Sequence, residues 1–551
     1  MPTLQFKGKN IIWNHHLAVP FHTLDEVPEL HHKSEMANGN MIIEGDNLIA
    51  LKALLPQYAG KIKCIYIDPP YNTGNEGWMY NDKVNSPLIN EWIGKEVGVE
   101  DLTRHDKWLC MMVPRLKLLR ELLSDEGAIF ISIDENEINS LRLIMREIFG
   151  EEAFVSQISV LCNPKGRSQD KYFATNHEYV LIYSKKIMPK GYFSIEKDPE
   201  QIEFEYPEED EVDKYRLLEL RNTHREFGKY NRKNLYYPFY IIDEEGNISL
   251  KKENGAIEVY PVWDDGFEGC WTWEPKKVEA DIDLLIARRI KDSWKIYRKS
   301  YASGVEKMLK TILSDKLFHT EKGQKVFNQL FNIKGKLFNA PKSVDLIKTL
   351  LQTLTKENDI IIDSFSGSGT TMHADMELNK EDGGSRQCIM IQMQENSVNE
   401  PDKNICKDIT RERVKRAIDK NEYDAGFNYY RLGIPLDAET MLEGQLPTYS
   451  QFAKYVYYLC TGENLEAEDK INEADFYVGE HGNQAIYLVY KQDYETLTHL
   501  ALNLTLADKI KEKQPGKKRI VYAPSCFLDE EYLTDNQIEF VGIPYNLFQR
   551  R

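Results

Sequence analysis

The chain has 551 residues, of which 42% are hydrophobic and 29% charged, and its formal net charge is −18. That length exceeds what one hydrophobic core supports and predicts roughly three to four domains of ordinary globular composition. No apolar run approaches the ~18 residues that a membrane span needs, and the first residues do not read as a signal peptide. We therefore expect a cytoplasmic protein that does not associate with membranes. Its eight cysteines lack paired metal-ligand spacing and are expected to be free thiols.

The negative net charge argues weakly against a nucleic-acid partner, because phosphate binding needs local positive charge. The charge is nevertheless unevenly distributed. Basic residues gather between 288 and 310, whereas acidic residues gather between 203 and 213. A basic strip on an acidic protein is compatible with DNA binding, and a solvated helix face explains the same strip equally well.

Strands alternate with helices over residues 41–185. The predicted strands end just before polar residues, and they cover 41–43, 62–67, 128–133 and 179–183. Helices are expected from Leu48 to Leu55, over about 108–123, and up to Gly150; Gly127 is expected to end the second of them. This alternation predicts a mainly parallel, doubly wound sheet.

The alternation stops over residues 186–335, where aromatic and charged residues dominate, and this segment is predicted to be an inserted domain. It resumes over 336–426, with helices at 343–354 and 370–378 and strands at 360–362 and 388–393. Residues 427–551 have their own pattern, with strands at 485–490 and 519–522 and a helix near 495–512, and residues 1–40 form an N-terminal arm. The predicted fold is an α/β, Rossmann-like doubly wound sheet with an inserted domain and a C-terminal α/β module.

A glycine-rich turn follows the predicted strand that ends at Asp363. Gly367 and Gly369 would let the backbone approach a ligand, and Thr370 and Thr371 can open the next helix. This is the geometry of a cofactor site at the carboxyl edge of a parallel sheet. A tight turn without a ligand remains an alternative; a dinucleotide site is disfavoured because the spacing is not G-x-G-x-x-G. Glu395, after the next strand, stands where ribose hydroxyls are usually bound.

A second motif, Asp68-Pro69-Pro70-Tyr71, also follows a buried strand. Prolines stiffen the backbone and lack N–H donors, so the carbonyls are left to accept. The Asp68 carboxylate and the Pro69 carbonyl could accept both hydrogens of an adenine N6 amino group, while Tyr71 would stack on the base. A base must leave the duplex to reach such a site. A proline-stiffened exit from the strand is the alternative interpretation.

Together the two motifs resemble the β-class amino-methyltransferases, in which the catalytic motif precedes the cofactor motif and the target-recognition region lies between them. The resemblance covers most of residues 40–400 and is closest to the modification (Mod) subunits of type III restriction–modification systems. Further stretches match this pattern: Glu44–Asn47, Asp68–Gly74, Tyr80–Asp82, Ser132–Glu137, Asn176–Tyr179, Phe338–Lys342 and Gln392–Glu395.

The resemblance implies S-adenosylmethionine as the cofactor and no catalytic metal. It implies that Asp46 contacts the cofactor adenine, that Glu395 binds the ribose, and that Phe338 and Lys342 belong to a segment packing over the methionine part. The residues implied to enclose the methionine part are Asp363, Phe365, Ser366, Gly367, Ser368, Gly369, Thr370 and Thr371. Ser364 and Ser343 depart from the commonest family pattern, in which proline stands at both positions.

The resemblance also assigns regions and partners. Residues 41–185 would be the catalytic half of the methyltransferase domain, 186–335 the target-recognition domain and 336–426 the half that binds S-adenosylmethionine. The implied partners are double-stranded DNA, a restriction subunit and a second copy of the chain, and residues 427–551 would contact DNA or a partner subunit by analogy.

These observations predict a site-specific DNA adenine-N6 methyltransferase that acts by direct displacement, since aspartate at position 68 favours adenine over cytosine. The alternatives are a cytosine-N4 enzyme, a non-catalytic recognition subunit that guides a restriction partner, and a protein glutamine methyltransferase.

Two other groups of residues invite interpretation as metal ligands and are assigned otherwise. The pairs His15-His16 and His31-His32 are expected to be surface histidines, and the acids Asp134, Glu135 and Glu137 are expected to favour a helix N-terminus.

Overall fold

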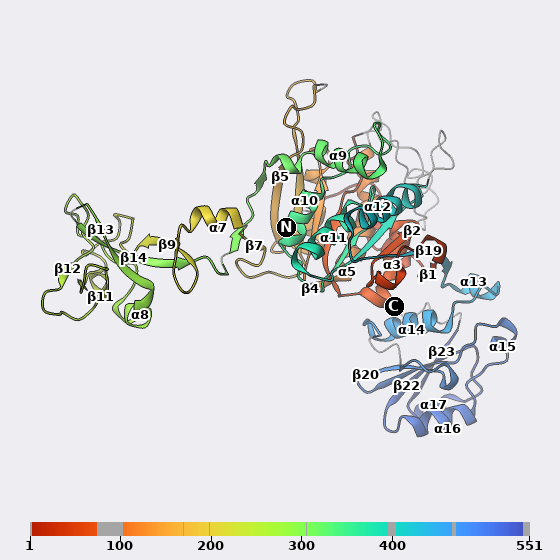
Figure 1. The fold of residues 1–551 in the computed structure, drawn as a ribbon. Coiled ribbons are helices and arrows are strands. Elements are labelled where there is room, and N and C mark those ends of the chain that lie inside the picture. Colours follow the sequence, from red (N-terminus) through yellow and green to blue (C-terminus); the bar gives the residue numbers. More distant parts are fainter. Residues whose placement is uncertain are drawn as a thin grey trace. The chain divides into compact units, whose positions relative to one another are not determined.

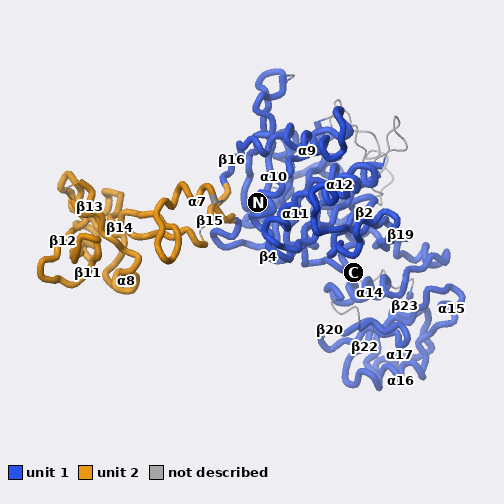
Figure 2. Tube along the Cα trace, viewed as in Figure 1, with its two compact units in different colours: residues 1–193, 310–551 blue, residues 194–309 orange. Residues whose placement is uncertain are grey.

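The computed structural model describes residues 3–73, 103–168, 170–197, 199–291, 293–304, 306–394, 404–465 and 470–543. The chain divides into two compact units, which are coloured separately in Figure 2. Unit 1 comprises residues 1–193 and 310–551, and unit 2 comprises residues 194–309. Unit 2 lies within the segment predicted to be an inserted domain.

Unit 1 is built on a ten-stranded sheet, of which strands β1, β2, β4, β5 and β19 are labelled in Figure 1. Five neighbouring strands at its centre are parallel: β2 (Met41–Glu44), β18 (Gln387–Gln392), β17 (Ile360–Asp363), β3 (Ile62–Ile67) and β4 (Leu123–Ile133). On one side β2 pairs with β19 (Asn428–Pro435), which pairs with β1 (His22–Glu26). On the other side the order continues with β6 (His177–Ser184), β5 (Phe154–Leu161) and β16 (Ile312–Leu313). The predicted α/β, mainly parallel sheet is confirmed.

The order of the strands reverses between β3 and β17. The chain runs from β2 through β3 to β4 and only later to β17 and β18, yet β17 lies directly between β3 and β18. Ile361 and Ile362 pair with Cys64 and Ile65 of β3. The carboxyl ends of these strands therefore lie next to each other, and such a reversal opens the crevice in which open α/β sheets bind ligands.

Helices cover both faces of this sheet. On one face α3 (Asn47–Tyr58), α5 (Arg104–Leu122) and α6 (Ile138–Phe149) share a hydrophobic core with strand residues such as Ile65 and Ile129. The alternate strand residues point to the opposite face. That face is covered by three helices that take no part in the first core: α10 (Val344–Gln352), α11 (Thr370–Asp382) and α12 (Glu412–Asn421). Among the described residues, no helix is long and apolar enough to cross a membrane.

Two details differ from the sequence-based expectation. Gly127 does not end a helix: α5 ends at Leu122, and Gly127 lies inside β4. A Cβ at Gly127 would lie 2.7 Å from the Ile62 carbonyl oxygen, so the close approach of β3 explains the glycine. The second difference is that four strands of the sheet were not predicted, namely β1, β5, β16 and β19; in β5 only two of the eight residues are buried.

The C-terminal part of unit 1 contains a separate four-stranded sheet with its own core. Its strands are β20 (Tyr477–His481), β21 (Gln484–Leu488), β22 (Lys518–Ala523) and β23 (Ile538–Gly542). The helix predicted near 495–512 is two helices, α15 (Tyr494–Thr498) and α16 (Leu504–Lys513), and α17 (Glu530–Asp535) follows. Helix α14 (Tyr449–Thr461) precedes the sheet and packs against α3.

Four short helices complete unit 1: α1 (Lys9–Ile12), α2 (His15–Ala18), α9 (Thr320–Phe331) and α13 (Ala438–Leu442). The histidine pair at the start of α2 is buried, with 8% and 6% of its surface exposed, so the expectation of surface histidines was wrong for His15 and His16. Within the described ranges, no group of three His, Cys, Asp or Glu side chains has a metal-binding arrangement.

Unit 2 is mainly antiparallel. Its elements are β7 (Ser194–Glu196), α7 (Pro199–Glu205), β8 (Glu208–Glu209), β9 (Lys214–Glu219), β10 (Phe239–Ile241), β11 (Ile248–Ser249), β12 (Ile257–Val259), α8 (Pro275–Ala280), β13 (Leu285–Ile290), β14 (Ser293–Tyr301) and β15 (Glu306–Met308). A hydrophobic core that includes Leu220, Phe239, Trp271 and Ile296 holds it together. The basic strip around residue 288 lies on the β13–β14 hairpin rather than on a helix.

Because unit 2 has its own core, we expect residues 194–309 to fold when expressed alone. Trp271 is 2% exposed and its indole N–H donates to the Tyr237 carbonyl at 2.7 Å. Trp271→Ala should lower the free energy of unfolding by about 3–5 kcal/mol, whereas Tyr230→Ala, at a site 63% exposed, should change it little. Thermal and urea unfolding followed by circular dichroism measures both; a fragment without a cooperative transition would contradict the assignment.

Candidate active site

The tetrapeptide that begins at Asp68 leaves the carboxyl end of β3 and is held from both sides. The Trp108 indole N–H donates to the Pro70 carbonyl at 2.7 Å. No described residue donates a hydrogen bond to the Pro69 carbonyl. Asn72 then adopts a left-handed conformation, with φ of 60°, and turns the chain. The backbone after the strand is thus fixed, with the Pro69 oxygen left as an acceptor.

A buried ammonium group joins this tetrapeptide to two distant segments. The Lys342 Nζ atom lies 3.3 Å from Asp68 Oδ1 and 2.6 Å from Glu178 Oε2, and it donates to the Tyr71 hydroxyl at 2.5 Å. The Tyr71 hydroxyl in turn donates to Glu178 Oε2 at 3.1 Å. Lys342 was expected near the cofactor, and its side chain lies against Asp68 and Tyr71. Glu178 was not predicted as a site residue, although it stands in one of the stretches that matched the family pattern.

The electrostatics of this cluster favour a charged Lys342. Burial alone would lower its pKa, but Asp68 and Glu178 outweigh burial and raise it. Burial raises the pKa of Asp68, Lys342 opposes this, and the Glu178 carboxylate adds to the increase. For Glu178 burial acts in the same direction, yet the contacts with Lys342 and Tyr71 leave its pKa lowered. The Asp68 side chain keeps 28% of its surface exposed, so a ligand can reach it.

A second buried carboxylate supports the turn after the tetrapeptide. Glu137 is completely buried. Its Oε1 atom accepts a hydrogen bond from Asn72 Nδ2 at 2.5 Å and lies 2.6 Å from His105 Nδ1. Glu137 was expected to favour a helix N-terminus; although it precedes α6, its side chain makes no capping bond. Asp134 binds the backbone and side chain of Asn136 instead. Both carboxylates lie just before the N-terminus of α6, as expected, but their hydrogen bonds go to other partners and neither side chain caps the helix.

Asp363 organises the glycine-rich turn at the end of β17. Its Oδ1 atom accepts the Phe365 backbone N–H at 3.0 Å, and its Oδ2 atom accepts the Thr371 hydroxyl at 2.5 Å. The side chain of Ser366 donates back to the Asp363 carbonyl at 2.8 Å. Burial raises the pKa of Asp363 to about 7, against the effect of these hydrogen bonds.

The two glycines are required by close packing. Both have positive φ, 49° at Gly367 and 77° at Gly369. A Cβ on Gly367 would lie 3.3 Å from the Phe338 ring, and one on Gly369 would lie 3.0 Å from the Thr410 carbonyl oxygen. Phe338 therefore covers the turn, and the glycines are needed even before a ligand is considered.

The hydroxyl groups of the turn are used within the protein, with one exception. Arg413 is completely buried and donates to Ser368 Oγ at 2.7 Å and to Thr370 Oγ1 at 2.6 Å; burial lowers its pKa to about 9. This arginine was not predicted from the sequence. Ser364, only 1% exposed, has a hydroxyl oxygen with no hydrogen-bond partner among the described residues. An unpaired buried hydroxyl is costly and marks a place where a polar ligand would be favoured.

Asp46 lies at the start of α3 and connects to the same turn. Its Oδ1 atom caps the helix by accepting Leu48 N at 2.8 Å, and its Oδ2 atom lies 3.2 Å from Arg115. The neighbouring Asn47 donates to the Ser364 carbonyl at 2.9 Å. The network thus joins the N-terminus of α3 to the end of β17. Glu395 and the stretch Tyr80–Asp82 lie outside the described residues.

Comparison with known proteins gives a consistent family. The sequence model of the family of N6 and N4 methyltransferases, which is described as DNA methylase, matches residues 62–403. The chain is 35% identical over 379 residues to the type III restriction-modification enzyme EcoPI Mod subunit of Escherichia phage P1, covering 65% of this chain and 58% of that protein. It is 31% identical over 361 residues to the type II methyltransferase M.KpnI of Klebsiella pneumoniae, covering 65% of this chain and 81% of that protein.

The match to the EcoP15I Mod subunit of Escherichia coli is 29% identical over 445 residues and covers 67% of that protein, so the chain spans about three fifths to two thirds of these two type III relatives. Among solved structures, PvuII DNA methyltransferase (cytosine-N4-specific) is 13% identical with a TM-score of 0.32, covering 70% of this chain and 93% of that one. That score is too low to support a conclusion, and the fold rests on the sheet topology.

The raised pKa of Asp363 predicts a pH-dependent stability. Between pH ~4 and ~7 the unfolded carboxyl releases its proton while the folded one keeps it, because the folded pKa is about 7 against an ordinary value of 3.8. The free energy of unfolding should therefore fall as the pH rises, by up to about 1.4 kcal/mol per pH unit from this group. Asp363→Asn removes that term. Melting temperatures of both proteins from pH 4 to 8 should converge at low pH and diverge in favour of Asp363→Asn as the pH rises; parallel curves would contradict the assignment.

Proposed function

We propose that this chain, which belongs to the N6 and N4 DNA methylase family, transfers a methyl group from S-adenosylmethionine to the N6 atom of adenine in double-stranded DNA. The observation that carries the proposal is the position of two sites at one edge of the sheet. Asp68 follows β3 and Asp363 ends β17, and these neighbouring parallel strands flank the point where the strand order reverses. A donor and an acceptor bound at these ends would meet.

The residues around Asp363 fit the cofactor. Ser364 offers a buried hydroxyl without a partner among the described residues, and Phe338 covers the turn at Gly367. Asp46 lies in the network that reaches this turn, and we assign it to the cofactor adenine by resemblance. When bound, S-adenosylmethionine supplies a sulfonium-activated methyl group. Phe365, Ser366, Ser368, Thr370 and Thr371 shape this turn, and Glu395 remains a proposed ribose ligand by resemblance alone.

Asp68 and the Pro69 carbonyl would accept the two hydrogens of the adenine N6 amino group. Accepting both hydrogens holds the nitrogen toward tetrahedral geometry and directs its lone pair at the methyl group. Tyr71, anchored through its hydroxyl by Lys342 and Glu178, would present its ring to the base.

As the N6–carbon bond forms and the carbon–sulfur bond breaks, N6 must lose a proton. The Asp68 carboxylate is the proposed acceptor, because burial already raises its pKa and its partner Lys342 stays charged. Before the transfer, Lys342 limits the cost of keeping Asp68 and Glu178 ionised side by side; afterwards it remains paired with Glu178.

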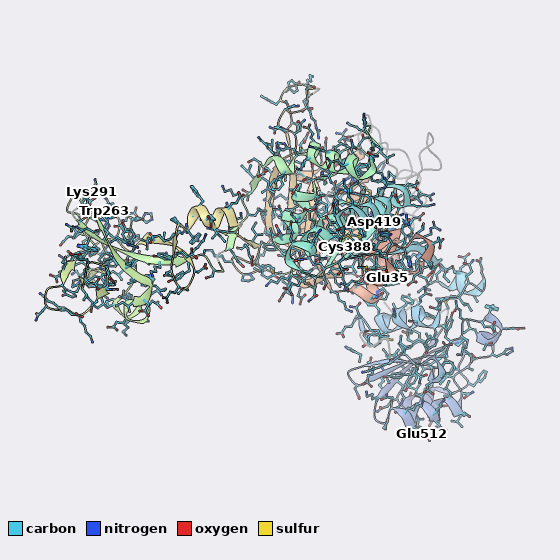
Figure 3. All side chains as sticks on the ribbon, viewed as in Figure 1. Glu35, Trp263, Lys291, Cys388, Asp419 and Glu512 are labelled. Carbon is cyan, nitrogen blue, oxygen red and sulfur yellow. The ribbon has the colours of Figure 1, made fainter. Side chains whose placement is uncertain are left out.

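Unit 2 is the proposed target-recognition domain. The side chains of Trp263 and Lys291 lie at the same end of it in the view of Figure 3. Arg289 and Lys291 are exposed at the tip of the β13–β14 hairpin, where phosphate contact is feasible. Several other cations of unit 2 are neutralised internally: Arg225 pairs with Asp265 at 2.6 Å, and Lys229 with Glu268 at 2.6 Å. A restriction subunit and a second copy of the chain are proposed partners by resemblance.

The direct test incubates the purified protein with methyl-labelled S-adenosylmethionine and unmethylated genomic DNA, followed by digestion to nucleosides. Labelled N6-methyladenine nucleoside supports the proposal, and sequencing of the modified DNA then gives the recognised site. Labelled N4-methylcytosine nucleoside would support the second candidate function, cytosine-N4 methylation, because the matched family covers both N6 and N4 methyltransferases. Label in protein, or no transfer despite cofactor binding, would contradict the proposal.

Asp68→Ala should abolish methyl transfer while leaving the cofactor in place. Because Asp68 lies on the β3 side and the cofactor turn follows β17, we expect transfer to fall at least about 100-fold with cofactor affinity changed less than about threefold. Labelled-methyl transfer and isothermal titration measure the two effects. Asp125→Ala, on the exposed start of β4, is the control. Equal losses of transfer and cofactor binding would overturn the assignment of roles.

Glu178→Gln should move the pH dependence of the reaction. The Glu178 carboxylate helps to raise the pKa of Asp68, so its removal should lower that pKa, and Asp68 should remain ionised at lower pH. We expect the acid limb of kcat/KM to shift to lower pH by roughly half a unit to one unit. Glu126→Gln, whose side chain is 75% exposed, should leave the limb in place. An unchanged limb or a shift to higher pH in Glu178→Gln would rule out this coupling.

A further inference from the structure

The hairpin between β5 and β6 carries two aromatic side chains that the fold leaves in water. Tyr172 is 78% exposed and Phe173 is 89% exposed. The hairpin stands out from unit 1 at the top of the views in Figures 1 and 2. A single exposed apolar side chain is ordinary, but two adjacent aromatic rings at one hairpin form a contiguous apolar patch, and such patches mark interaction sites.

The base of this hairpin is ordered by its own hydrogen bonds. Beyond the last β5–β6 pair, the backbone N–H groups of Cys162 and Asn163 both donate to the Asn176 carbonyl at 3.1 Å. Arg167 N donates to the Thr175 carbonyl at 2.9 Å. Gly166, with φ of 70°, lies so close to the opposite arm that a Cβ there would approach the Ala174 side chain to 2.6 Å. The fold therefore presents the two aromatic residues on a defined support.

The charges of the hairpin favour a polyanion. Lys165, Arg167 and Lys171 are exposed. Its described acid, Asp170, accepts the Thr175 backbone N–H at 2.7 Å, which lowers its pKa and keeps it negatively charged, so the three cations outnumber one anion. Arg167 lies 3.9 Å from Glu135, a long and half-exposed pair that leaves its charge largely available.

The hairpin is also close to the candidate active site. Strand β6 begins at His177, and the next residue is Glu178, which contacts Lys342 and Tyr71. Phe173 precedes Glu178 by five residues, which even in a fully extended chain span at most about 17 Å. A group at the hairpin tip can thus contact the duplex from which a base enters the site.

We propose that residues 162–168 and 170–176 form a DNA wedge, in which Tyr172 and Phe173 insert into the base stack while Lys165, Arg167 and Lys171 contact phosphates. This inference rests on the proposed function. Inserted apolar side chains partly unstack neighbouring bases, and an enzyme that acts on an extruded base must meet that unstacking cost. The aromatic pair occupies the place of the departed base, so the extruded state gains stacking contacts that it would otherwise lack.

The test compares Tyr172→Ala/Phe173→Ala with the wild type, and Ile11→Ala serves as the control because Ile11 is an exposed apolar side chain on α1, with 39% of its surface accessible. The recognised site is first read from DNA that the wild type has modified. Methyl transfer is then measured on a matched duplex and on the same duplex with a mismatch opposite the target base. We expect the double variant to be about 10- to 100-fold slower on the matched duplex, and the mismatch to restore most of the rate because the base is already unstacked.

Equal rates for the double variant and the control would overturn the wedge, and so would a loss that is the same on both duplexes. If the wild type transfers no methyl group to DNA, the proposed function fails, and the hairpin is judged by duplex binding alone. Fluorescence anisotropy at several salt concentrations then compares the wild type with Lys165→Ala/Arg167→Ala/Lys171→Ala. The loss of three phosphate contacts should reduce the slope of log affinity against log salt concentration by about two to three. An unchanged slope would overturn the proposed DNA contact. A protein partner would then be the remaining candidate for this hairpin.

Discussion

The buried ammonium of Lys342 is the interaction on which the candidate site depends. Two carboxylates, Asp68 and Glu178, lie within 3.3 Å of it, and the Tyr71 hydroxyl binds both the ammonium and Glu178. Neighbouring buried carboxylates repel each other, and without a cation between them at least one would take up a proton. Lys342 thus opposes the rise in the pKa of Asp68 that burial causes and favours its ionised form. Its own carbonyl accepts a weak hydrogen bond from Thr370 at 3.5 Å, which links this cluster to the glycine-rich turn.

The strand order explains why residues so far apart in sequence meet at one edge. Because β17 lies between β3 and β18, the tetrapeptide that begins at Asp68 and the glycine-rich turn that follows Asp363 become neighbours. The long intervening segment leaves the sheet after β6 and returns before α10, and it contains unit 2. Because unit 2 is inserted between elements of the sheet and has its own core, its sequence can change without disturbing the sheet.

Much of this could be predicted from local patterns. Strands β3 and β17 were predicted because buried parallel strands appear as continuous apolar runs, and the polar residues after them marked the sheet edge. Strand β5 was missed because Ser156, Gln157 and Ser159 interrupt its apolar residues, so it lacks that signal. Gly127 was misread because a glycine after an apolar helix looks like a stop, whereas its real cause is the backbone of β3, which no local pattern contains.

The pairings in the site could not be predicted from spacing. Lys342 and Tyr71 are 271 residues apart, and Lys342 and Glu178 are 164 apart. Arg413 approaches the glycine turn from α12, where its basic side chain has no local signature. Each of these contacts exists only once the sheet has brought its strands together, and the sequence offered at most a resemblance to point at the right stretch.

The most direct measurement is the affinity of Lys342→Met for S-adenosylmethionine, by isothermal titration, beside its rate of methyl transfer. If Lys342 serves Asp68, the affinity should stay within about threefold of the wild type while transfer falls at least about 100-fold. Lys348→Met is the control. It removes a lysine on α10 that pairs with Glu377 and Glu381 on α11, and it should change neither the affinity nor the rate of transfer. An affinity that falls in step with transfer would make Lys342 a cofactor ligand and contradict the account.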